Sequence, residues 1–183
     1  MSTQPTLPTI CKTNHLSLEE FTNVISLLFE PTALLTQRIY DARPYESYDQ
    51  LLDKADELIK ELSPLEQLEV VNAHPRIGEK ASKLSALSKM EQGKPSANED
   101  AILAKWAELN KKYEDKYGFR FVIFVNGRSK ESLFPIVEDR ISNSTKNQEL
   151  LTGLSEMVDI ARDRARKLQA ASLNDGSAPS PKI

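Results

Sequence analysis

Signals that start α-helices recur at short intervals along this chain, and they constrain its fold more than any other feature. In each, a serine or threonine is followed three residues later by glutamate or glutamine, so that the two side chains can cap the first backbone N–H groups of a helix. Apolar residues at helical spacing come after each signal. The starts that fit this pattern are Ser17, Ser47, Ser63, Ser96 and Thr145. Further helices are expected over residues 32–42 and after Ser129, where Pro135 would bend the first turn.

Only residues 119–125, Phe-Arg-Phe-Val-Ile-Phe-Val, have the aromatic and β-branched composition of a strand. A single strand has no partner for its backbone hydrogen bonds. We therefore expect this segment to be buried among the helices as an irregular or short helical element. The predicted fold class is all-α, a single-domain bundle of about seven to nine helices.

The length and the local composition predict one folded domain with two polar ends. A chain of 183 residues suits one domain, because domains of about 150 residues are typical. Residues 1–15 are expected to be a flexible N-terminus and residues 16–170 the helical domain. The tail, residues 171–183, is rich in serine, proline and glycine and is expected to be disordered.

Composition argues against several classes of partner. The net charge of −3 offers no basic surface for nucleic acid. No apolar run approaches the roughly 18 residues that would span a bilayer, and no signal peptide is recognisable, so we expect a cytoplasmic protein without a membrane partner. A metal site would have to combine Cys11, His15 and His74 through a flexible N-terminus, so a reaction without metal is expected.

His74 is the first candidate for chemistry, since it is one of only two histidines. The helix that begins at Ser63-Pro64 must stop at Pro75, which places His74 at its C-terminus with the ring free to project. The negative end of the helix favours a protonated imidazole there. The alternative interpretation is a histidine that only satisfies the last carbonyls of the helix.

Ser88, Glu91 and Gln92 form a second candidate group. Their spacing is that of a capping box, but Gly93 and Pro95 leave little room for a helix. A hydroxyl, a carboxylate and an amide together suit a small ligand dense in hydrogen-bond donors and acceptors. Ordinary loop polarity is the competing explanation.

An arginine near the end of the last helix is a candidate for binding an anion. Arg164 lies near the border of the apolar face, where it can bury its stem and present its guanidinium to a carboxylate. Arg140 is the alternative for this role. Phosphate-binding glycine loops, zinc-ligand spacings and serine-hydrolase motifs are absent from the sequence.

Taken in order, these motifs closely resemble the 2-oxo-4-hydroxy-4-carboxy-5-ureidoimidazoline (OHCU) decarboxylase family over roughly residues 17–170. The motifs that carry the resemblance are His74-Pro75 with Gly78 and Lys80, Ser88 with Glu91-Gln92, Leu109-Asn110 with Tyr113, Tyr117-Gly118-Phe119 with Phe121-Val122, and a final helix with residues 160–164.

The resemblance implies an all-α, cofactor-free carboxy-lyase, commonly a homodimer, that produces (S)-allantoin from its ureidoimidazoline substrate in urate degradation. It implies that His74 is the catalytic histidine and Glu91 its partner carboxylate. The positions that match substrate contacts are Pro75, Ser88, Gln92, Phe119, the backbone of Phe121, Val122 and Ile123, and Arg164.

Two positions depart from the family pattern. Arg76-Ile77 stands where an aspartate-leucine pair is common, and Arg120 stands where a proline is common. These two cations could accept a different anion or could be surface substitutions. The last residues, Pro181-Lys182-Ile183, loosely resemble the Ser-Lys-Leu peroxisomal signal, so the peroxisome stands beside the cytosol as a compartment.

Two other functions remain compatible with the sequence. The first is a non-catalytic helical module that binds a purine-derived ligand or a protein partner, which ligand binding without turnover would reveal. The second is a hydrolase of a related ureide, which would release ammonia or urea in place of carbon dioxide.

Overall fold

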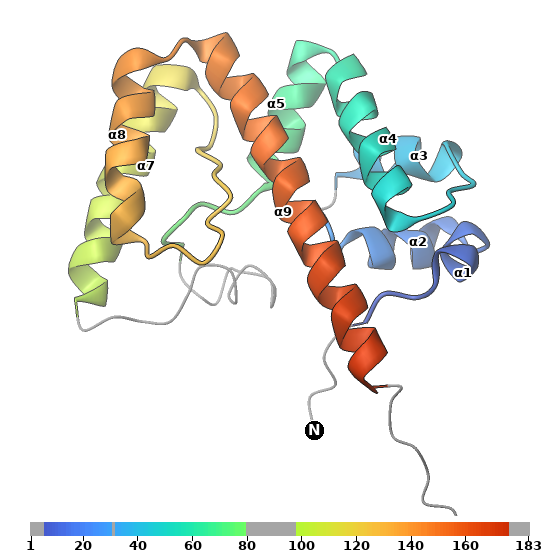
Figure 1. The fold of residues 1–183 in the computed structure, drawn as a ribbon. Coiled ribbons are helices and arrows are strands. Elements are labelled where there is room, and N and C mark those ends of the chain that lie inside the picture. The colour runs from blue at the N-terminus through green and yellow to red at the C-terminus, as the bar shows by residue number, and fades with distance from the viewer. Residues whose placement is uncertain (1–5, 31, 80–97, 176–183) are drawn as a thin grey trace, which may run out of the picture. The chain divides into compact units, whose positions relative to one another are not determined.

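The described part of the chain is mainly helical, with a long irregular segment between α7 (Glu99–Tyr117) and α8 (Phe134–Asn143) (Figure 1). The computed structural model describes residues 6–30, 32–79 and 98–175, and side chains as far as residue 171. These residues form eight α-helices and no strand, so the predicted all-α class is confirmed. The helices are α1 (Ile10–Asn14), α2 (Leu18–Ile25), α3 (Ala33–Asp41), α4 (Tyr48–Glu61), α5 (Pro64–Ala73), α7 (Glu99–Tyr117), α8 (Phe134–Asn143) and α9 (Lys146–Asp175), with a 3-10 helix, η2 (Glu131–Leu133), before α8.

The contacts divide the chain into two compact units. The first unit comprises residues 1–58 and 160–183, and the second comprises residues 59–159. Within the first unit α2 packs on α3, and within the second α7 packs on α8. The largest side chains of the first unit that are less than 2% exposed are Phe21, Ile25, Leu28, Ile39, Leu51 and Leu52.

An aromatic cluster forms the core of the second unit. Trp106, Tyr113 and Tyr117 come from one face of α7 and are at most 1% exposed. The ring of Tyr113 lies 5.8 Å from that of Phe119 and 5.1 Å from that of Phe121, both in edge-on geometry, which favours aromatic pairs. The loop after α7 is thereby tied to the helix that precedes it.

Most helix starts follow the predicted capping pattern. Complete capping boxes open α2 at Ser17 and α5 at Ser63, and Thr145 with Gln148 opens α9. The start predicted at Ser96 differs, since α7 begins at Glu99 with Asn98 as its N-cap and no side-chain cap. Ser96 itself lies outside the described residues.

Residues 6–15 are ordered, although they belong to the segment 1–15 that we expected to be flexible. Thr9 caps the short helix α1, and Leu7 is only 7% exposed. The hydroxyl of Thr13 lies 2.8 Å from the hydroxyl of Tyr48 in α4. Because this segment is held by a contact between residues far apart in sequence, its composition alone gave no sign of order.

The last helix extends beyond its predicted end near residue 170. It continues to Asp175, inside the segment that we expected to be a disordered tail. Ala170 and Ala171 have high helix propensity, so nothing in the sequence forces the helix to stop there. Residues 176–183 lie outside the described part of the chain.

Residues 119–125 are irregular and buried, as predicted. They lie in neither a strand nor a helix, and five of their seven side chains are buried. These five are Phe119, Phe121, Val122, Ile123 and Val125.

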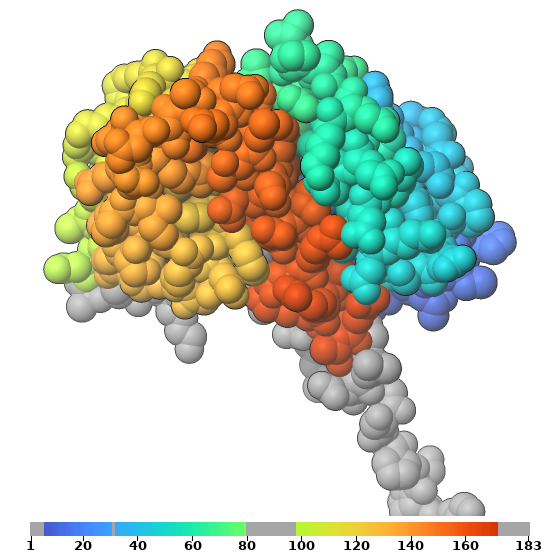
Figure 2. All heavy atoms as spheres, turned by 45° about the horizontal axis from the view of Figure 1, so that its top comes forward, coloured from blue at the N-terminus to red at the C-terminus, as the bar shows by residue number. Residues whose placement is uncertain are grey.

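Few large apolar side chains are exposed in the described residues. The beginning of α5 protrudes in the space-filling view (Figure 2), and Leu65 at this position is 79% exposed. No helix within the described ranges has both the length and the apolar character to cross a bilayer.

A buried ion pair joins α8 to α9 in the second unit. The Nε of Arg140 donates to Oε2 of Glu149 at 2.7 Å, and the hydroxyl of Tyr113 donates to the same oxygen at 2.7 Å. Glu149 is 2% exposed and Arg140 9%. Burial, and then the hydrogen bond to Glu149, raise the pKa of the Tyr113 hydroxyl, which therefore remains a donor.

Removing one charge of this pair should destabilise the protein strongly. We expect Glu149→Gln to lower the free energy of unfolding by about 3–5 kcal/mol, because Arg140 would remain buried without a countercharge. The double variant Arg140→Met/Glu149→Leu should recover part of this loss, since neither charge remains. Urea unfolding followed by circular dichroism measures both changes.

The exposed pair of Lys111 and Asp115, at 2.6 Å, provides the control. Asp115→Asn should leave stability nearly unchanged, because water screens both charges. A loss of less than about 1 kcal/mol for Glu149→Gln would contradict a structural role for the buried pair.

Candidate functional site

His74 lies at the end of α5, where the sequence predicted it. It is the C-cap residue, with φ −68° and ψ 137°, so its backbone has already left the helical conformation before Pro75. Its N–H donates to the carbonyl of Val71 at 3.4 Å. Both His74 and Pro75 are half-buried. The candidate acid therefore stands at a defined helix end and keeps part of its surface accessible.

The turn after Pro75 is held by its own backbone and by α7. The N–H of Arg76 donates to the carboxylate of Glu79, and the N–H of Glu79 returns to the carbonyl of Arg76. Asn110 of α7, only 5% exposed, donates from Nδ2 to the carbonyl of Ile77 at 2.9 Å. Gly78 has φ +77°, and a Cβ there would lie 2.9 Å from Cβ of Trp106. Glycine is required here by both the backbone conformation and the close approach to α7.

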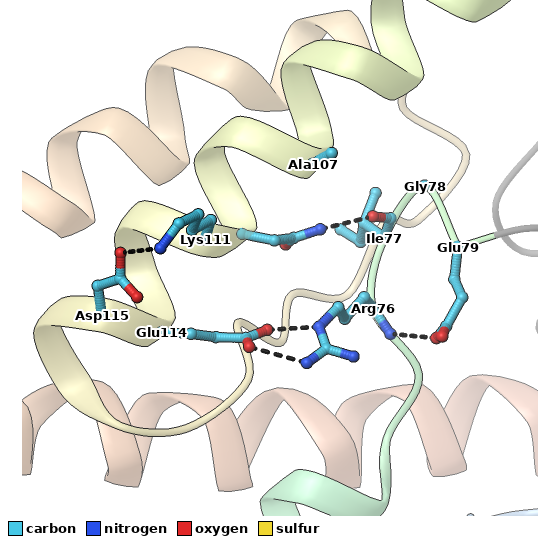
Figure 3. A pocket seen from close by; sticks show the side chains of 9 residues that line it. Arg76, Ile77, Gly78, Glu79, Ala107, Lys111, Glu114 and Asp115 are labelled. Carbon is cyan, nitrogen blue, oxygen red and sulfur yellow. Dashed lines mark hydrogen bonds and ion pairs between the residues drawn. The ribbon is translucent and has the colours of Figure 1, made fainter.

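The guanidinium of Arg76 is engaged by a carboxylate. It donates to both oxygens of Glu114 on α7, at 2.5 and 2.8 Å (Figure 3). The hydrogen bond to Glu114 is the main cause that raises the pKa of Arg76. The sequence left two explanations for Arg76, binding of a different anion or a surface substitution. Because its charge is already paired with Glu114, this geometry does not support anion binding.

A cavity of about 280 Å³ is lined by residues of both this turn and α7. Figure 3 shows that charged side chains of both signs surround it, with Arg76 facing Glu114 and Lys111 facing Asp115. The residues that line it are Arg76, Ile77, Gly78, Glu79, Ala107, Asn110, Lys111, Glu114 and Asp115. Because its charges are largely paired with one another, this cavity lacks the excess charge of an anion site.

Side chains from three helices hold the backbone of the irregular segment 119–125. The N–H of Arg120 donates to Oδ1 of Asn72 in α5 at 3.0 Å, and Nη1 of Arg140 in α8 donates to the carbonyl of Val122 at 3.1 Å. The N–H of Phe124 donates to Oε2 of Glu156 in α9 at 2.7 Å. Segment 119–125 is thus fixed without a neighbouring strand.

Some backbone groups of this segment make no hydrogen bond to the described part of the chain. Within the described ranges, no hydrogen bond engages the N–H or C=O of Phe121 or of Ile123. Buried backbone groups are normally paired. A ligand rich in amide and carbonyl groups would supply the missing donors and acceptors at the positions where the sequence predicted substrate contacts.

The segment also reaches His74 directly. Nη1 of Arg120 donates to the carbonyl of His74 at 2.9 Å. Arg120 therefore links His74 to the segment that contains four predicted contact residues. These four, Phe119, Phe121, Val122 and Ile123, belong to the second unit, as do His74 and Pro75. Ser88, Glu91 and Gln92 fall in residues 80–97, outside the described residues.

Arg164 belongs to the first unit and is more deeply buried than its place on the helix suggested. It is 2% exposed, whereas a border position predicted only a buried stem. Nη1 donates to the carbonyl of Leu28 at 3.3 Å, and Nη2 lies 3.5 Å from Oε1 of Glu30. Arg140, the alternative candidate, is committed to Glu149 and to Val122.

Three residues of this arrangement escaped the sequence analysis. Asn72, Glu149 and Glu156 each lie within a helix and carry no local signal that distinguishes them from solvent-exposed polar residues. Their partners are at least 9 residues away in sequence. Only their burial or their long-range partners identify them.

Comparisons with known proteins agree on one family. The family model described as OHCU decarboxylase matches residues 14–166. A uric acid degradation bifunctional protein of Bacillus sp. (strain TB-90) is 32% identical over 160 residues, which are 85% of this chain and 31% of that protein. This chain thus spans about a third of that relative. The 2-oxo-4-hydroxy-4-carboxy-5-ureidoimidazoline decarboxylase of Halalkalicoccus jeotgali is 29% identical over 157 residues, 85% of this chain and 88% of that protein.

Two solved structures share the fold. A crystal structure of OHCU decarboxylase in the presence of (S)-allantoin matches with a TM-score of 0.61 and 22% identity, covering 75% of this chain and 92% of that one. A crystal structure of (S)-allantoin synthase matches with a TM-score of 0.63 and 21% identity, covering 90% of this chain and 54% of that one.

The close approach of Gly78 to Trp106 should leave no room for a larger residue in the turn. We expect Gly78→Ala to destabilise the protein by about 2–4 kcal/mol, since a left-handed conformation and a steric overlap add together. Gly127 has φ +72° and no atom within 4 Å of an added Cβ, so Gly127→Ala measures the cost of the left-handed conformation alone. Thermal and urea unfolding should show that Gly127→Ala lowers the free energy of unfolding by about 1–2 kcal/mol. Equal losses in the two variants would exclude a role for the contact.

Proposed function

Because the chain belongs to the OHCU decarboxylase family, we propose that it decarboxylates 2-oxo-4-hydroxy-4-carboxy-5-ureidoimidazoline to (S)-allantoin as a step of urate degradation. One structural observation supports this most. A half-buried histidine at a helix end accepts a hydrogen bond, through its carbonyl, from Arg120 in segment 119–125. Among the residues that the structure describes, none is hydrogen-bonded to the backbone of Phe121 or Ile123 in this segment. Arg120 thus links the residue proposed as proton donor to the segment proposed to bind an amide-rich ring.

The chemistry of the substrate requires little beyond such a site. Its carboxylate leaves from a carbon that carries a hydroxyl and adjoins a C=N bond. When the bond to the carboxylate breaks, carbon dioxide departs and the electron pair moves into the ring, so the proposed reaction needs no cofactor as an electron sink. The enediol-like product must then gain a proton on one face of the neighbouring carbon.

We assign this proton transfer to His74. A positioned general acid with a pKa near the working pH typically contributes about 10²–10⁴ in rate. Delivery from one side fixes the stereocentre of (S)-allantoin, whereas water would add the proton to either face. Glu91 is proposed to orient the imidazole, and Ser88 and Gln92 to hold the ring and ureido groups.

The remaining assignments concern binding. The backbone of Phe121, Val122 and Ile123 is proposed to contact the substrate, because the resemblance assigns these positions and no described residue is hydrogen-bonded to the backbone of Phe121 or Ile123. Arg164 is proposed to bind the substrate anion through its guanidinium.

The proposed assembly is a homodimer. Exposed apolar side chains at Leu65 of α5 and Leu151 of α9, which are 79% and 49% exposed, offer contact surface within the second unit. Sedimentation equilibrium decides this assignment.

Loss of the imidazole should abolish catalysis without unfolding the protein. We expect His74→Ala to lower kcat by about 10²–10⁴ with freshly generated substrate. His15, which is exposed and whose ring contacts the carbonyl of Cys11, provides the matched control, and His15→Ala should retain full activity. Carbon dioxide release and optical rotation together measure rate and handedness.

Two results of these measurements would contradict the proposed function. Wild-type protein that binds the substrate tightly without turnover would indicate a non-catalytic module. A large loss of stability in His74→Ala would indicate that His74 only closes the helix.

Arg164 should act mainly through binding. We expect Arg164→Lys to raise KM about tenfold or more and to change kcat less, since a lysine cannot form the two parallel bonds of a guanidinium to a carboxylate. Arg162, on the same helix and paired with Asp53 at 2.7 Å, is the control, and Arg162→Lys should leave KM unchanged. An unchanged KM in a folded Arg164→Lys variant would remove Arg164 from the site.

A further inference from the structure

Arg120 makes two hydrogen bonds to the end of the helix that carries His74. Its backbone N–H donates to Oδ1 of Asn72 at 3.0 Å, and its Nη1 donates to the carbonyl of His74 at 2.9 Å. Asn72 and His74 belong to the last turn and the C-cap of α5. One residue of the irregular segment thus connects this segment to the helix end through both its main chain and its side chain.

The position of this guanidinium has a clear physical basis. The last carbonyls of a helix have no partners within it, and they carry the negative end of the helix dipole. A cationic donor at such a carbonyl is favourable. The contact joins residues 46 apart in sequence, so it fixes the relation between two segments that the chain does not hold together locally.

We propose that Arg120 is a positioning residue for the decarboxylation assigned above: its bond to the His74 carbonyl sets the distance between the imidazole and the backbone of residues 121–123. This inference rests on the proposed function. The carbonyl carbon and the Cβ of His74 are bonded to the same Cα, so a restraint on the carbonyl also restrains the direction in which the imidazole leaves the chain.

The contacts from α7 cannot replace this restraint. Asn110 holds the carbonyl of Ile77, and Glu114 holds the guanidinium of Arg76, so both act on the turn after Pro75. Arg120 instead acts on His74 itself and comes from the segment proposed to bind the substrate. Loss of the Arg120 side chain would leave only its backbone bond to Asn72, two residues before His74, so the acid and the bound ring could move relative to each other while the turn stays in place.

The first test separates positioning from binding. Arg120→Met keeps the apolar stem and removes the donors. Because displacements of about 1 Å can cost up to 10²-fold in rate, kcat should fall about 10- to 100-fold, whereas KM should change less than about threefold. Arg120→Lys should recover part of kcat, since its ammonium can still donate to the carbonyl of His74.

The handedness of the product gives a readout that a purely structural role would not move. When the imidazole is displaced, protonation by water competes, and water has no preference for either face. The excess of (S)-allantoin should therefore fall for Arg120→Met when product is analysed before any racemisation. A folded variant with wild-type kcat and wild-type handedness would overturn the proposal.

Arg128 supplies the matched control. Its guanidinium donates to the carbonyls of Phe124 and Val125, at the far end of the same segment from His74. Arg128→Met should leave kcat and handedness unchanged. If both arginine variants lost activity together and in proportion to their loss of stability, Arg120 would be structural only.

Nuclear magnetic resonance distinguishes failure of this inference from failure of the proposed function. The sequence has two histidines, so the ring resonances of His74 and His15 are readily assigned. Arg120→Met should shift or broaden the resonances of His74 and leave those of His15 unchanged. Unchanged His74 resonances would overturn the restraint even in an active enzyme. If Arg120→Met shifts the His74 resonances but the wild-type protein shows no turnover, the restraint on His74 stands and the catalytic role is overturned.

Discussion

The burial of segment 119–125 without a partner strand is the constraint on which the rest of the second unit depends. An irregular, apolar segment in a helical protein needs hydrogen bonds for its backbone, and here Asn72, Arg140 and Glu156 supply them from three different helices. These polar groups must themselves be buried or half-buried to reach the segment. The ion pair of Arg140 with Glu149 follows from this requirement, because a buried guanidinium needs a countercharge.

The same arrangement surrounds the histidine that we propose to be catalytic. His74 stands where α5 ends, and its surroundings are fixed from two sides. Helix α7 holds the following turn through Asn110, Glu114 and the close approach of Gly78, while Arg120 holds the carbonyl of His74. The proposed acid and the proposed substrate-binding backbone therefore belong to one connected set of contacts.

The two cations that depart from the family pattern serve these contacts. Arg76 is paired with Glu114, and Arg120 donates to a helix carbonyl, so each guanidinium is satisfied by the protein. Charge alone would have suggested a second anion. Their partners, both reached across the fold, indicate instead that each guanidinium stabilises the surroundings of His74.

The sequence by itself determined the all-α class, most helix starts, the placement of His74 at a helix end and the irregular burial of residues 119–125. These features depend on capping, proline geometry and apolar spacing within a few residues. The tertiary structure alone decided that Arg120 meets His74, that Arg140 is committed to Glu149 and Val122, and that α1 is ordered by Thr13 and Tyr48. Those contacts join residues between 9 and 46 positions apart, so only the folded chain brings their partners together.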